Sequence, residues 1–593
     1  MNKYVIRFLS WVLFLPLLLN CGWQDRQVYS PQKNESIPAG RIPEEWPIPL
    51  DYPPATAPRA MVATSEDLAT RVGVEILRGG GNAVDAAVAV AFALLVVHPL
   101  AGNLGGGGFA VLRMADGENA TIDFRETAPL AATREMYFEE EEEESRISSW
   151  SGHMAVGVPG TVAGLWEMRR RFGTLAWEDL IAPAISMAEE GILVPEHLSR
   201  NIGRVEKRLS QFPATAAIFL PEGKPPEAGS RWRNLDLAAT LRRIAAGGAD
   251  EFYRGKTADL LVAEMERGGG LITHEDLLAY RTRWREPVEF DYRGYHVISV
   301  PPPSSGGLVL GLITGILEGY DLKKMGWHSH AHVHAMAEAM RWGFGARNTF
   351  LGDPDFVDIP IDRFLSREMT TRYREEISTE RATPSSSVFP QDDGVADRGS
   401  TTHFSIVDPK GNAVAFTTTL NGWYGSGVTV AGAGFLLNNE MNDFTTKPGH
   451  PNRFGLIQGE ANSIAPGKRM LSSMTPTIVL DPDGALFLVT GGAGGSRIIS
   501  AVFQILSNAI DFDMGVNGAV NSPRFHQQHF PDRLSFEPDG TSDDLIQALE
   551  RSGHQVEPAR RFIGVSPTLL RKDGMWTGTG ESHRREGGSA RGF

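Results

Sequence analysis

Residues 400–421 have the sequence STTHFSIVDPKGNAVAFTTTLN, a pattern that predicts two short β-strands joined by a tight turn. THFSIV is β-branched and aromatic, DPKGN contains turn-forming residues, and AVAFTTTL alternates as a strand does. A Ser-Thr-Thr triplet opens the first strand, directly after the polar segment 384–399. Cleavage there would produce a chain that begins with threonine, which carries a nucleophilic hydroxyl and, in its α-amine, its own base. The pattern also fits an ordinary edge strand with a threonine-rich start, so the rest of the chain has to decide between the two.

Composition and charge indicate a globular protein and exclude some partners. The chain has 593 residues, of which 41% are apolar and 22% charged, which is enough for a large hydrophobic core. Its formal net charge of -15 argues against nucleic acid as a partner, because no basic stripe is present to neutralise phosphates. Cys21 is the only cysteine, which excludes disulfides and thiolate metal sites in the mature protein.

The N-terminus has the pattern of a targeting segment. Lys3 and Arg7 precede an apolar run, residues 11–19, that is too short to span a bilayer comfortably. The sequence Leu-Leu-Asn-Cys at 18–21 resembles a bacterial lipoprotein signal, although its asparagine stands where a small residue is usual.

We therefore expect residues 1–21 to be a signal peptide, with a possible lipid anchor at Cys21. Residues 22–58 are rich in proline and polar residues and are expected to form a tether. The expected location is the periplasm or the outer membrane of a bacterium.

Two segments near residue 100 are expected to lie deep in the protein. Residues 82–98 are nearly all apolar and small, but Asp85 and the limited length favour a buried core helix over a membrane span. The glycine-rich run GNLGGGGF at 102–109 follows this helix, whereas a nucleotide-binding glycine loop follows a strand. We therefore expect a tight passage of the backbone there.

Several polar residues further along the chain suit the chemistry of an amide. Arg125 ends a predicted strand and has the planar fork that grips a carboxylate, although such residues often form only a surface ion pair. Glu440 and Asp443 could serve as acid and base, bind an ammonium group, or be ordinary turn residues. Ser472 and Ser473 supply paired hydroxyls ahead of another predicted strand.

A glycine turn, GGAGG at 491–495, joins the predicted strand 485–490 to the predicted helix 496–510. Bare backbone N–H groups and the positive end of a helix dipole can cradle an anion, and this turn suits an oxyanion as well as a phosphate. A nucleophile with an oxyanion cradle indicates acyl transfer. Together with the arginine, serines and carboxylates, it favours an amidase that acts on an amino-acid-like substrate.

The histidines at 328, 330, 332 and 334 have a spacing that a metal site could use. On a helix, His330, His334 and Glu338 would share one face. Because no second group of ligands completes the shell, we expect a polar helix start there, with no metal and no other cofactor in the protein.

A set of short motifs runs in order across nearly the whole chain after the expected tether. The motifs are GGNAVDAAVA at 80–89, GGGGF at 105–109, DFRE at 123–126, GVPGTVAG at 157–164, GGLIT..DL at 269–277, DYRGY at 291–295, PPPSSGG at 301–307, TTHFSIVD at 401–408, LLNNEMNDF at 436–444, LSSMTPTIV at 471–479, GGAGGSRII at 491–499 and PRFHQQ at 523–528. Each is weak alone, but in this order they resemble the γ-glutamyltranspeptidase (γ-glutamyl hydrolase) family.

The resemblance implies the α+β fold of the N-terminal-nucleophile hydrolases, a four-layer αββα sandwich formed by two fragments of one precursor. The family cuts itself before the first threonine of the TTH motif, which is here the Ser400–Thr401 bond. We therefore expect a large subunit, residues 59–400, and a small subunit, residues 401–593, that stay together as a heterodimer.

The resemblance also assigns catalytic roles to residues at matching motif positions. Thr401 would be the nucleophile that forms a γ-glutamyl ester, with its freed α-amine as general base and Thr419 as the residue that orients it. The N–H groups of Gly494 and Gly495 would form the oxyanion hole. Phe454 would cover the pocket from a lid loop at residues 447–459.

The remaining matched positions would hold the two charged groups of the donor. Its α-carboxylate would contact Arg125, Ser472 and Ser473. Its α-amino group would contact Asn421, Glu440 and Asp443.

Two classes of function remain open. The first is an enzyme that transfers the γ-glutamyl group of glutathione or a related donor to water, an amino acid or a dipeptide. A glutaryl-type acylase shares the fold and nucleophile but needs no α-amino pocket, so Asn421, Glu440 and Asp443 favour the γ-glutamyl donor. The second class is a non-catalytic binding relative displayed at the cell surface, which the intact catalytic positions disfavour.

Overall fold

A computed structural model of the protein describes residues 42–138, 147–389, 400–447, 449–452, 455–559 and 561–593. The expected signal peptide with Cys21 and the first part of the expected tether lie outside these residues. The described residues belong to one compact unit, whose two main sheets both combine strands from before and after residue 400. Among the described helices, none has both the length and the apolar character needed to cross a bilayer.

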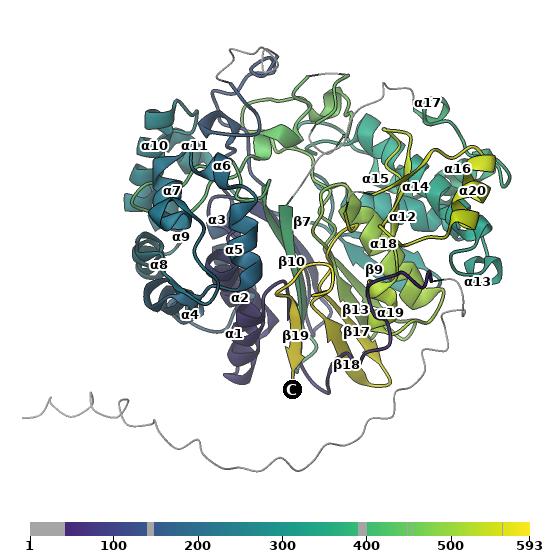
Figure 1. The fold of residues 1–593 in the computed structure, drawn as a ribbon, viewed down its shortest axis with the longest axis horizontal. Helices are drawn as coiled ribbons and strands as arrows, with labels where there is room; N and C mark the ends of the chain where they lie inside the picture. The colour runs from purple at the N-terminus through teal and green to yellow at the C-terminus, as the bar shows by residue number, and fades with distance from the viewer. Residues whose placement is uncertain (1–41, 139–146, 390–399, 448, 453–454, 560) are drawn as a thin grey trace, which may run out of the picture. The chain divides into compact units, whose positions relative to one another are not determined.

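Two seven-stranded sheets pack face to face, and all neighbouring strands in them are antiparallel (Figure 1). The first sheet has the order β19 (Ser589–Gly592), β2 (Met61–Thr64), β10 (Ser400–Val407), β11 (Ala413–Asn421), β3 (Gly107–Arg113), β4 (Asn119–Asp123) and β7 (Arg283–Arg285). The second has the order β1 (Ala55–Ala57), β18 (Met575–Thr579), β17 (Thr568–Lys572), β13 (Leu486–Thr490), β12 (Thr477–Leu480), β9 (Tyr295–Ser299) and β8 (Val288–Tyr292). Two small sheets consist of β14 (Phe525–His526), β15 (Leu534–Phe536) and β16 (Val556–Pro558), and of β5 (Ile192–Leu193) and β6 (Arg231–Trp232).

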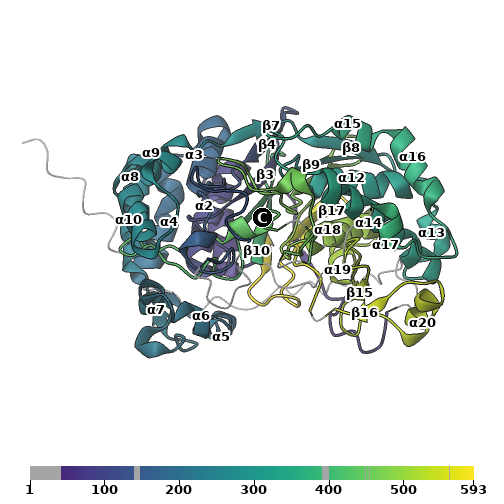
Figure 2. The ribbon, with the colours of Figure 1, turned by 90° about the horizontal axis from the view of Figure 1, so that it is seen from above.

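Helices cover the outer face of each sheet (Figure 2). The first sheet carries α1 (Asp67–Arg78), α2 (Ala83–Val97), α3 (Thr161–Phe172), α4 (Trp177–Glu190), α5 (Glu196–Gly203), α6 (Glu206–Leu209), α7 (Pro213–Phe219), α8 (Leu235–Gly247), α9 (Ala249–Arg254), α10 (Lys256–Gly268) and α11 (His274–Ala279) on its side. The second carries α12 (Gly306–Leu317), α13 (Leu322–Met325), α14 (His330–Phe350), α15 (Ile361–Leu365), α16 (Arg367–Glu376), α17 (Ser385–Val388), α18 (Arg497–Ile510), α19 (Val516–Asn521) and α20 (Asp543–Arg551). The expected αββα sandwich is therefore confirmed.

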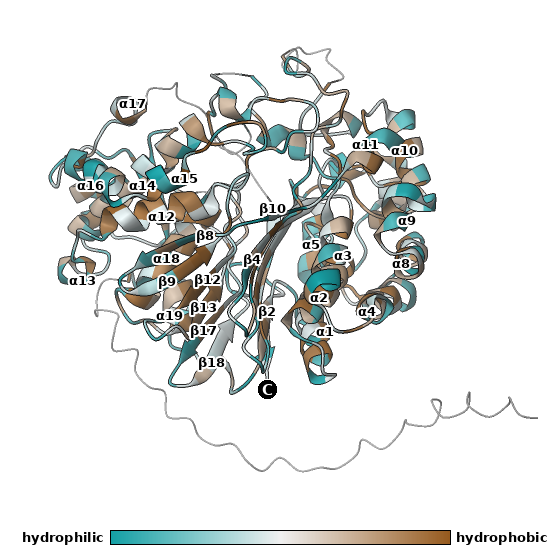
Figure 3. Cartoon of the chain, turned by 180° about the vertical axis from the view of Figure 1, so that it is seen from behind, coloured by the Kyte–Doolittle hydropathy of each residue, from teal (hydrophilic) through white to brown (hydrophobic). Residues whose placement is uncertain are grey.

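The alternation of residues along the central strands explains why the sheets are covered on both faces. On β3, Ala110 and Leu112 join the core shared with the first set of helices, whereas Phe109 and Val111 join the core shared with the second sheet. Side chains of a strand point alternately to its two faces, and here both faces are apolar. Figure 3 shows helix α12, which covers the second sheet, largely in the hydrophobic colour.

Helix α2 is the expected buried core helix. All its residues are buried, and Asn82 caps it by accepting hydrogen bonds from the N–H groups of Val84 and Asp85. The Asp85 carboxylate accepts a hydrogen bond from the Asn82 N–H at 2.9 Å, which completes a capping box. An apolar helix without a polar face must be buried on all sides, as this one is.

The glycine run after α2 is the expected tight passage of the backbone. A Cβ atom at Gly106 would overlap the carbonyl oxygen of Thr419, and one at Gly105 would overlap the carbonyl oxygen of Leu436. Only glycine allows strand β3 to start this close to the end of β11.

The C-terminal part of the expected tether, residues 22–58, is folded against the rest of the protein. Trp46 and Ile48 are buried, and the Trp46 indole donates to the carbonyl of Asn521 at 3.2 Å. Strand β1 pairs with β18 at the edge of the second sheet. Residues 46–57 are therefore part of the folded unit. The proline-rich composition of this segment predicted a tether although it contains apolar residues that pack against the protein.

The histidines of α14 make hydrogen bonds within the protein. His334 Nδ1 lies 2.8 Å from His554 Nε2, and its Nε2 lies 2.7 Å from the carbonyl oxygen of Ser378. His330 Nε2 lies 3.0 Å from Ser552 Oγ. Within the described residues, no group of three or more histidine, cysteine or acidic side chains is arranged to hold a metal ion.

Candidate active site

The hairpin of β10 and β11 brings the two candidate threonines side by side. Thr401 lies opposite Thr419, and Ser400 lies opposite Asn421, with an irregularity of the register between Ser400 and Thr401. Thr401 is buried, and its carbonyl oxygen accepts a hydrogen bond from Arg585 Nη1 at 3.1 Å. The predicted cleavage site therefore lies at the head of a strand that is fixed on both sides.

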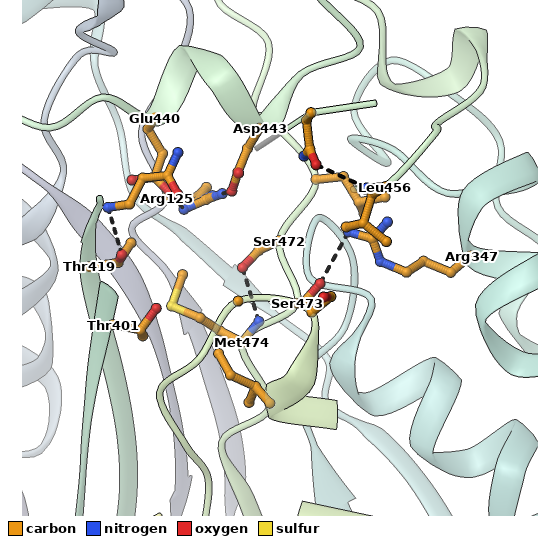
Figure 4. A pocket seen from close by; sticks show the side chains of 16 residues that line it. Arg125, Arg347, Thr401, Thr419, Glu440, Asp443, Leu456, Ser472, Ser473 and Met474 are labelled. Atoms are coloured by element: carbon orange, nitrogen blue, oxygen red, sulfur yellow. Dashed lines mark hydrogen bonds and ion pairs between the residues drawn. The ribbon is translucent and has the colours of Figure 1, made fainter. Parts of the chain in front are cut away.

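A pocket opens at this end of the hairpin (Figure 4). Nine of the ten catalytic and substrate-binding residues expected from the sequence line it: Arg125, Thr401, Thr419, Asn421, Glu440, Asp443, Ser472, Ser473 and Gly495. Gly494, the tenth, directly precedes Gly495. Residues far apart in the sequence thus converge on one site.

Arg125 lies at the centre of a buried group of charges. It follows β4, and its Nη1 contacts Glu440 Oε1 while its Nη2 lies 2.6 Å from Asp443 Oδ2. Its Nε donates to the carbonyl of Met470 at 3.3 Å, and Glu126 lies 3.5 Å from Nη1. The expected carboxylate-binding arginine therefore already touches both expected ammonium-binding carboxylates.

The carboxylates of this group are harder to ionise than usual. Burial raises the pKa of the Glu126 carboxyl to about 7, against the opposing effect of the Arg125 charge. Burial likewise raises the pKa values of Glu440 and Asp443. One oxygen each of Glu126 and Glu440 has no hydrogen-bond partner among the described residues. Carboxylates with a buried, unpartnered oxygen are suited to receive a donor such as an ammonium group.

The paired serines present hydroxyls whose hydrogens are available. Ser472 Oγ accepts from the Met474 N–H at 3.1 Å, and Ser473 Oγ accepts from Arg347 Nη2 at 3.1 Å. Within the described chain, neither hydroxyl has a protein acceptor for its own hydrogen. Ser305, in the turn before α12, holds the pair in place by donating its N–H and its hydroxyl to the carbonyl of Ser472.

The glycine turn between β13 and α18 presents free N–H groups beside the threonines. Gly494 and Gly495 have φ values of 141° and 63°, a conformation that favours glycine. Ala493 anchors the turn through two hydrogen bonds with Val565, of 2.8 and 2.9 Å. In the part of the chain that the structure describes, the N–H groups of Gly494 and Gly495 have no protein acceptor, so both are available to an anion.

The second strand of the hairpin fixes its own polar groups. Thr419 Oγ1 accepts from the Asn421 N–H at 2.7 Å, and the Asn421 side chain donates to the carbonyl of Asn439 at 3.0 Å. Asn421 has a φ of 67°, a conformation that asparagine tolerates better than most residues. Thr419 and Asn421 both line the pocket.

Several lining residues carried no signal in the sequence. Arg347, in the last turn of α14, is a buried cation in the pocket wall. Asn452 and Leu456 also line the pocket, so the expected lid loop reaches it, although Phe454 lies outside the described residues. These residues belong to segments whose patterns indicated only a helix and a loop.

Comparisons with known proteins agree with this site. A family model described as Gamma-glutamyltranspeptidase matches residues 69–591. The glutathione hydrolase proenzyme of Pseudomonas sp. (strain A14) is 48% identical over 517 residues, which cover 87% of this chain and 88% of that protein. The glutathione hydrolase proenzyme of Escherichia coli (strain K12) is 43% identical over 531 residues, which cover 89% of this chain and 91% of that protein.

A solved structure has a similar fold over most of the chain. The crystal structure of cephalosporin acylase from Bacillus halodurans has a TM-score of 0.81 and 29% sequence identity, over 93% of this chain and 99% of that one. The family model and the two proenzymes match the chain over most of its length. The chain therefore belongs to the γ-glutamyltranspeptidase family.

Proposed function

We propose that this protein is a self-processing γ-glutamyltransferase and glutathione hydrolase. One observation carries the proposal: a nucleophile candidate, an anion cradle, free serine hydroxyls and buried carboxylates line one pocket. The names of the two proenzyme relatives support the same activity and the same maturation.

Maturation would begin with the hydroxyl of Thr401. Its oxygen attacks the carbonyl carbon of Ser400, the bond from that carbon to the Thr401 nitrogen breaks, and the nitrogen takes up the hydroxyl proton. Water then hydrolyses the resulting ester. The products are a large fragment that ends at Ser400 and a small fragment that begins with Thr401 and has a free α-amine, and the two remain paired as a heterodimer.

Catalysis would use the new N-terminus. The Thr401 hydroxyl attacks the γ-carbonyl of the donor, and the α-amine accepts its proton. The N–H groups of Gly494 and Gly495 stabilise the oxyanion. The leaving amine takes the proton, which leaves a γ-glutamyl ester on Thr401, and water or the amino group of an amino acid or dipeptide then releases the product. Thr419, opposite Thr401 in the hairpin, orients the nucleophile.

The two ends of the donor would bind to opposite charges in the pocket. The α-carboxylate is held by the hydroxyl hydrogens of Ser472 and Ser473 and by Arg125. The α-ammonium group is held by Glu440, Asp443 and Asn421. The unpartnered oxygen of Glu440 supports this direction of binding.

Two other functions are less well supported by the site. A glutaryl-type acylase, which the likeness to a cephalosporin acylase brings into view, acts on an acyl group without an α-amine. Buried carboxylates would then face no cation of the substrate, which is unfavourable. A non-catalytic binding protein would have no need for a strand head that places a hydroxyl beside an anion cradle.

The test combines maturation with product analysis. On a denaturing gel, the protein should separate into two fragments, and the smaller should begin at Thr401 by N-terminal sequencing. With glutathione, the mature enzyme should release glutamate, and with an added dipeptide it should form a γ-glutamyl peptide. Thr401→Ala should abolish both cleavage and turnover; substantial activity in that variant would require another nucleophile.

We also propose that the protein is exported, with a possible lipid anchor at Cys21. The support is the sequence of residues 1–21, in which a basic start precedes a short apolar run. Fractionation of cells, with labelling by a radioactive fatty acid, tests this: recovery in the cytoplasm would contradict export, and absence of label would contradict the anchor.

A further inference from the structure

The pocket contains a second arginine that no role above requires. Arg347 is 1% exposed and enters the pocket from α14, on the opposite side from Arg125 (Figure 4). It is separated in the sequence from every motif that predicted the site.

The partners of the two arginines differ in charge. Arg347 donates to four neutral oxygens: Ser305 Oγ at 3.0 Å, Asn348 Oδ1 at 2.9 Å, Gln458 Oε1 at 3.1 Å and Ser473 Oγ at 3.1 Å. No described carboxylate lies within ion-pair distance of it. Arg125, by contrast, contacts the carboxylates of Glu126, Glu440 and Asp443.

A buried guanidinium without an acidic partner is unfavourable in a protein interior. Burial accordingly lowers the pKa of Arg347 to about 10, with an opposing effect of the Asp443 charge and a further lowering by the charge of Arg125. Such a cation is retained where a ligand brings the missing negative charge. The charge of Arg125, by contrast, is already offset by three protein carboxylates without a ligand.

The hydrogen bond between Arg347 and Ser473 gives this charge a direction. Because Ser473 Oγ accepts from Arg347, the hydrogen of this hydroxyl points elsewhere, and no described protein group accepts it. A hydroxyl polarised by a guanidinium is a stronger donor, since neighbouring hydrogen bonds reinforce one another. An anion that accepts from Ser473 therefore also interacts with the charge of Arg347.

We propose that Arg347 is a positioning residue for the donor's α-carboxylate: it orients the Ser473 hydroxyl toward this group. It also adds a positive charge that no described carboxylate of the protein offsets in an ion pair, whereas the charge of Arg125 is offset by three. The inference rests on the proposed function and assigns a specificity role within it. Arg347 thereby selects donors that carry an α-carboxylate.

The experiment compares two chromogenic donors, a γ-glutamyl anilide and a 4-aminobutyryl anilide, which keeps the amine but lacks the α-carboxylate. Loss of a charged hydrogen bond in Arg347→Met should raise KM for the γ-glutamyl anilide about 10- to 100-fold. KM for the 4-aminobutyryl anilide should stay within about twofold of wild type, because no interaction with that donor is lost. Arg293→Met, the same substitution at an arginine outside the pocket, should change KM for neither donor.

A double-mutant cycle tests the route through Ser473. Ser473→Ala and Arg347→Met should each raise KM for the γ-glutamyl anilide, and the double variant should be less impaired than the product of the two effects. Independent effects would show that Arg347 does not act through Ser473 and would overturn the positioning role.

Further outcomes separate this inference from the function on which it rests. A rise of KM by the same factor for both donors, or no rise, would show a structural role only and overturn the inference. If Arg347→Met fails to mature, Arg347→Lys replaces it in the test, because lysine keeps the charge but not the planar fork. Arg347→Lys should raise KM for the γ-glutamyl anilide by a smaller factor and leave KM for the 4-aminobutyryl anilide unchanged. An equal rise for both donors would again overturn the inference. A wild-type enzyme that does not cleave the γ-glutamyl anilide would instead refute the proposed function.

Discussion

Gly106→Ala is expected to disable the site without touching any residue that contacts the substrate. Gly106 lies in the glycine passage that leads into β3. Its carbonyl oxygen accepts from the N–H groups of Gly160 and Thr161 at 2.8 and 3.1 Å, so the residue cannot shift freely. A methyl group here would overlap the carbonyl oxygen of Thr419 and lie 2.7 Å from Asn103 Oδ1.

The magnitude follows from what must move. Asn103 Nδ2 donates to the Thr419 carbonyl at 2.9 Å and to Thr418 Oγ1 at 3.0 Å, and relieving the overlap breaks or stretches these bonds. Overpacking costs about 1–3 kcal/mol and each lost hydrogen bond about 1 kcal/mol, so the folded state should lose about 2–5 kcal/mol. A displacement of Thr419 by about 1 Å would reduce turnover by about 100-fold if Thr419 orients the nucleophile as proposed.

The assay follows maturation on a gel and, in the matured fraction, kcat with a γ-glutamyl anilide. Gly203→Ala is the matched control, because its new methyl group would meet only Pro225 Cγ, at 3.6 Å. Gly106→Ala should mature slowly and show a reduced kcat, whereas Gly203→Ala should behave like wild type. Equal maturation and kcat in the two variants would refute the argument that this close approach holds Thr419 in place.

Two further predictions concern stability. Trp46→Ala removes a buried indole and its hydrogen bond to Asn521, so the uncleaved Thr401→Ala protein carrying it should unfold with about 3 kcal/mol less free energy in denaturant titrations; no change would restore the tether interpretation for this residue. Burial raises the pKa of Glu126 from 4.5 to about 7 in the folded state. Between these pH values the folded state binds a proton that the unfolded state has lost. The free energy of unfolding that this proton contributes is complete below pH 4.5 and is lost as the pH rises to 7. The glutamine side chain of Glu126→Gln does not titrate, so the Tm of this variant should fall less between pH 5 and pH 8 than that of wild type. An identical fall in Tm would contradict this assignment.

Local patterns predicted the fold where the cause is local. The alternation of AVAFTTTL and the turn residues before it led to the β10–β11 hairpin, and the nearly continuous apolar run at 82–98 led to α2. The αββα order of the layers could be predicted only from the resemblance to a family. Strand order depends on contacts between distant segments, which local patterns do not reveal. The segment around Trp46 was misjudged because proline-rich composition indicates an extended chain but not whether that chain packs against a sheet.

The site could be predicted only as far as its motifs extend. Arg125, Ser472 and Glu440 stand in distinctive local sequences, and the fold brings them together. The pairing of Arg125 with Glu440 and Asp443 could not be predicted, because a side chain's ion-pair partner depends on the three-dimensional packing. Arg347 was missed for the same reason: an arginine within a helix of mixed composition has no local feature that marks it as part of a pocket wall.

On the proposed function, the distribution of charge in the pocket would place the γ-carbonyl of the donor, rather than its α-carboxylate, next to Thr401. A donor with an α-carboxylate and an α-ammonium group carries no net charge, so a pocket of uniform sign would gain nothing by binding it. Here Glu440 and Asp443 stand on one side with Arg125 between them, so that their two carboxylates outnumber the one guanidinium. Arg347 with the Ser473 hydroxyl stands on the other side. A zwitterion can satisfy both sides in only one orientation, since reversal would place like charges together at low dielectric. The α-carbon would thereby be fixed at two points, and the side chain that carries the γ-carbonyl would extend toward Thr401 and the glycine turn.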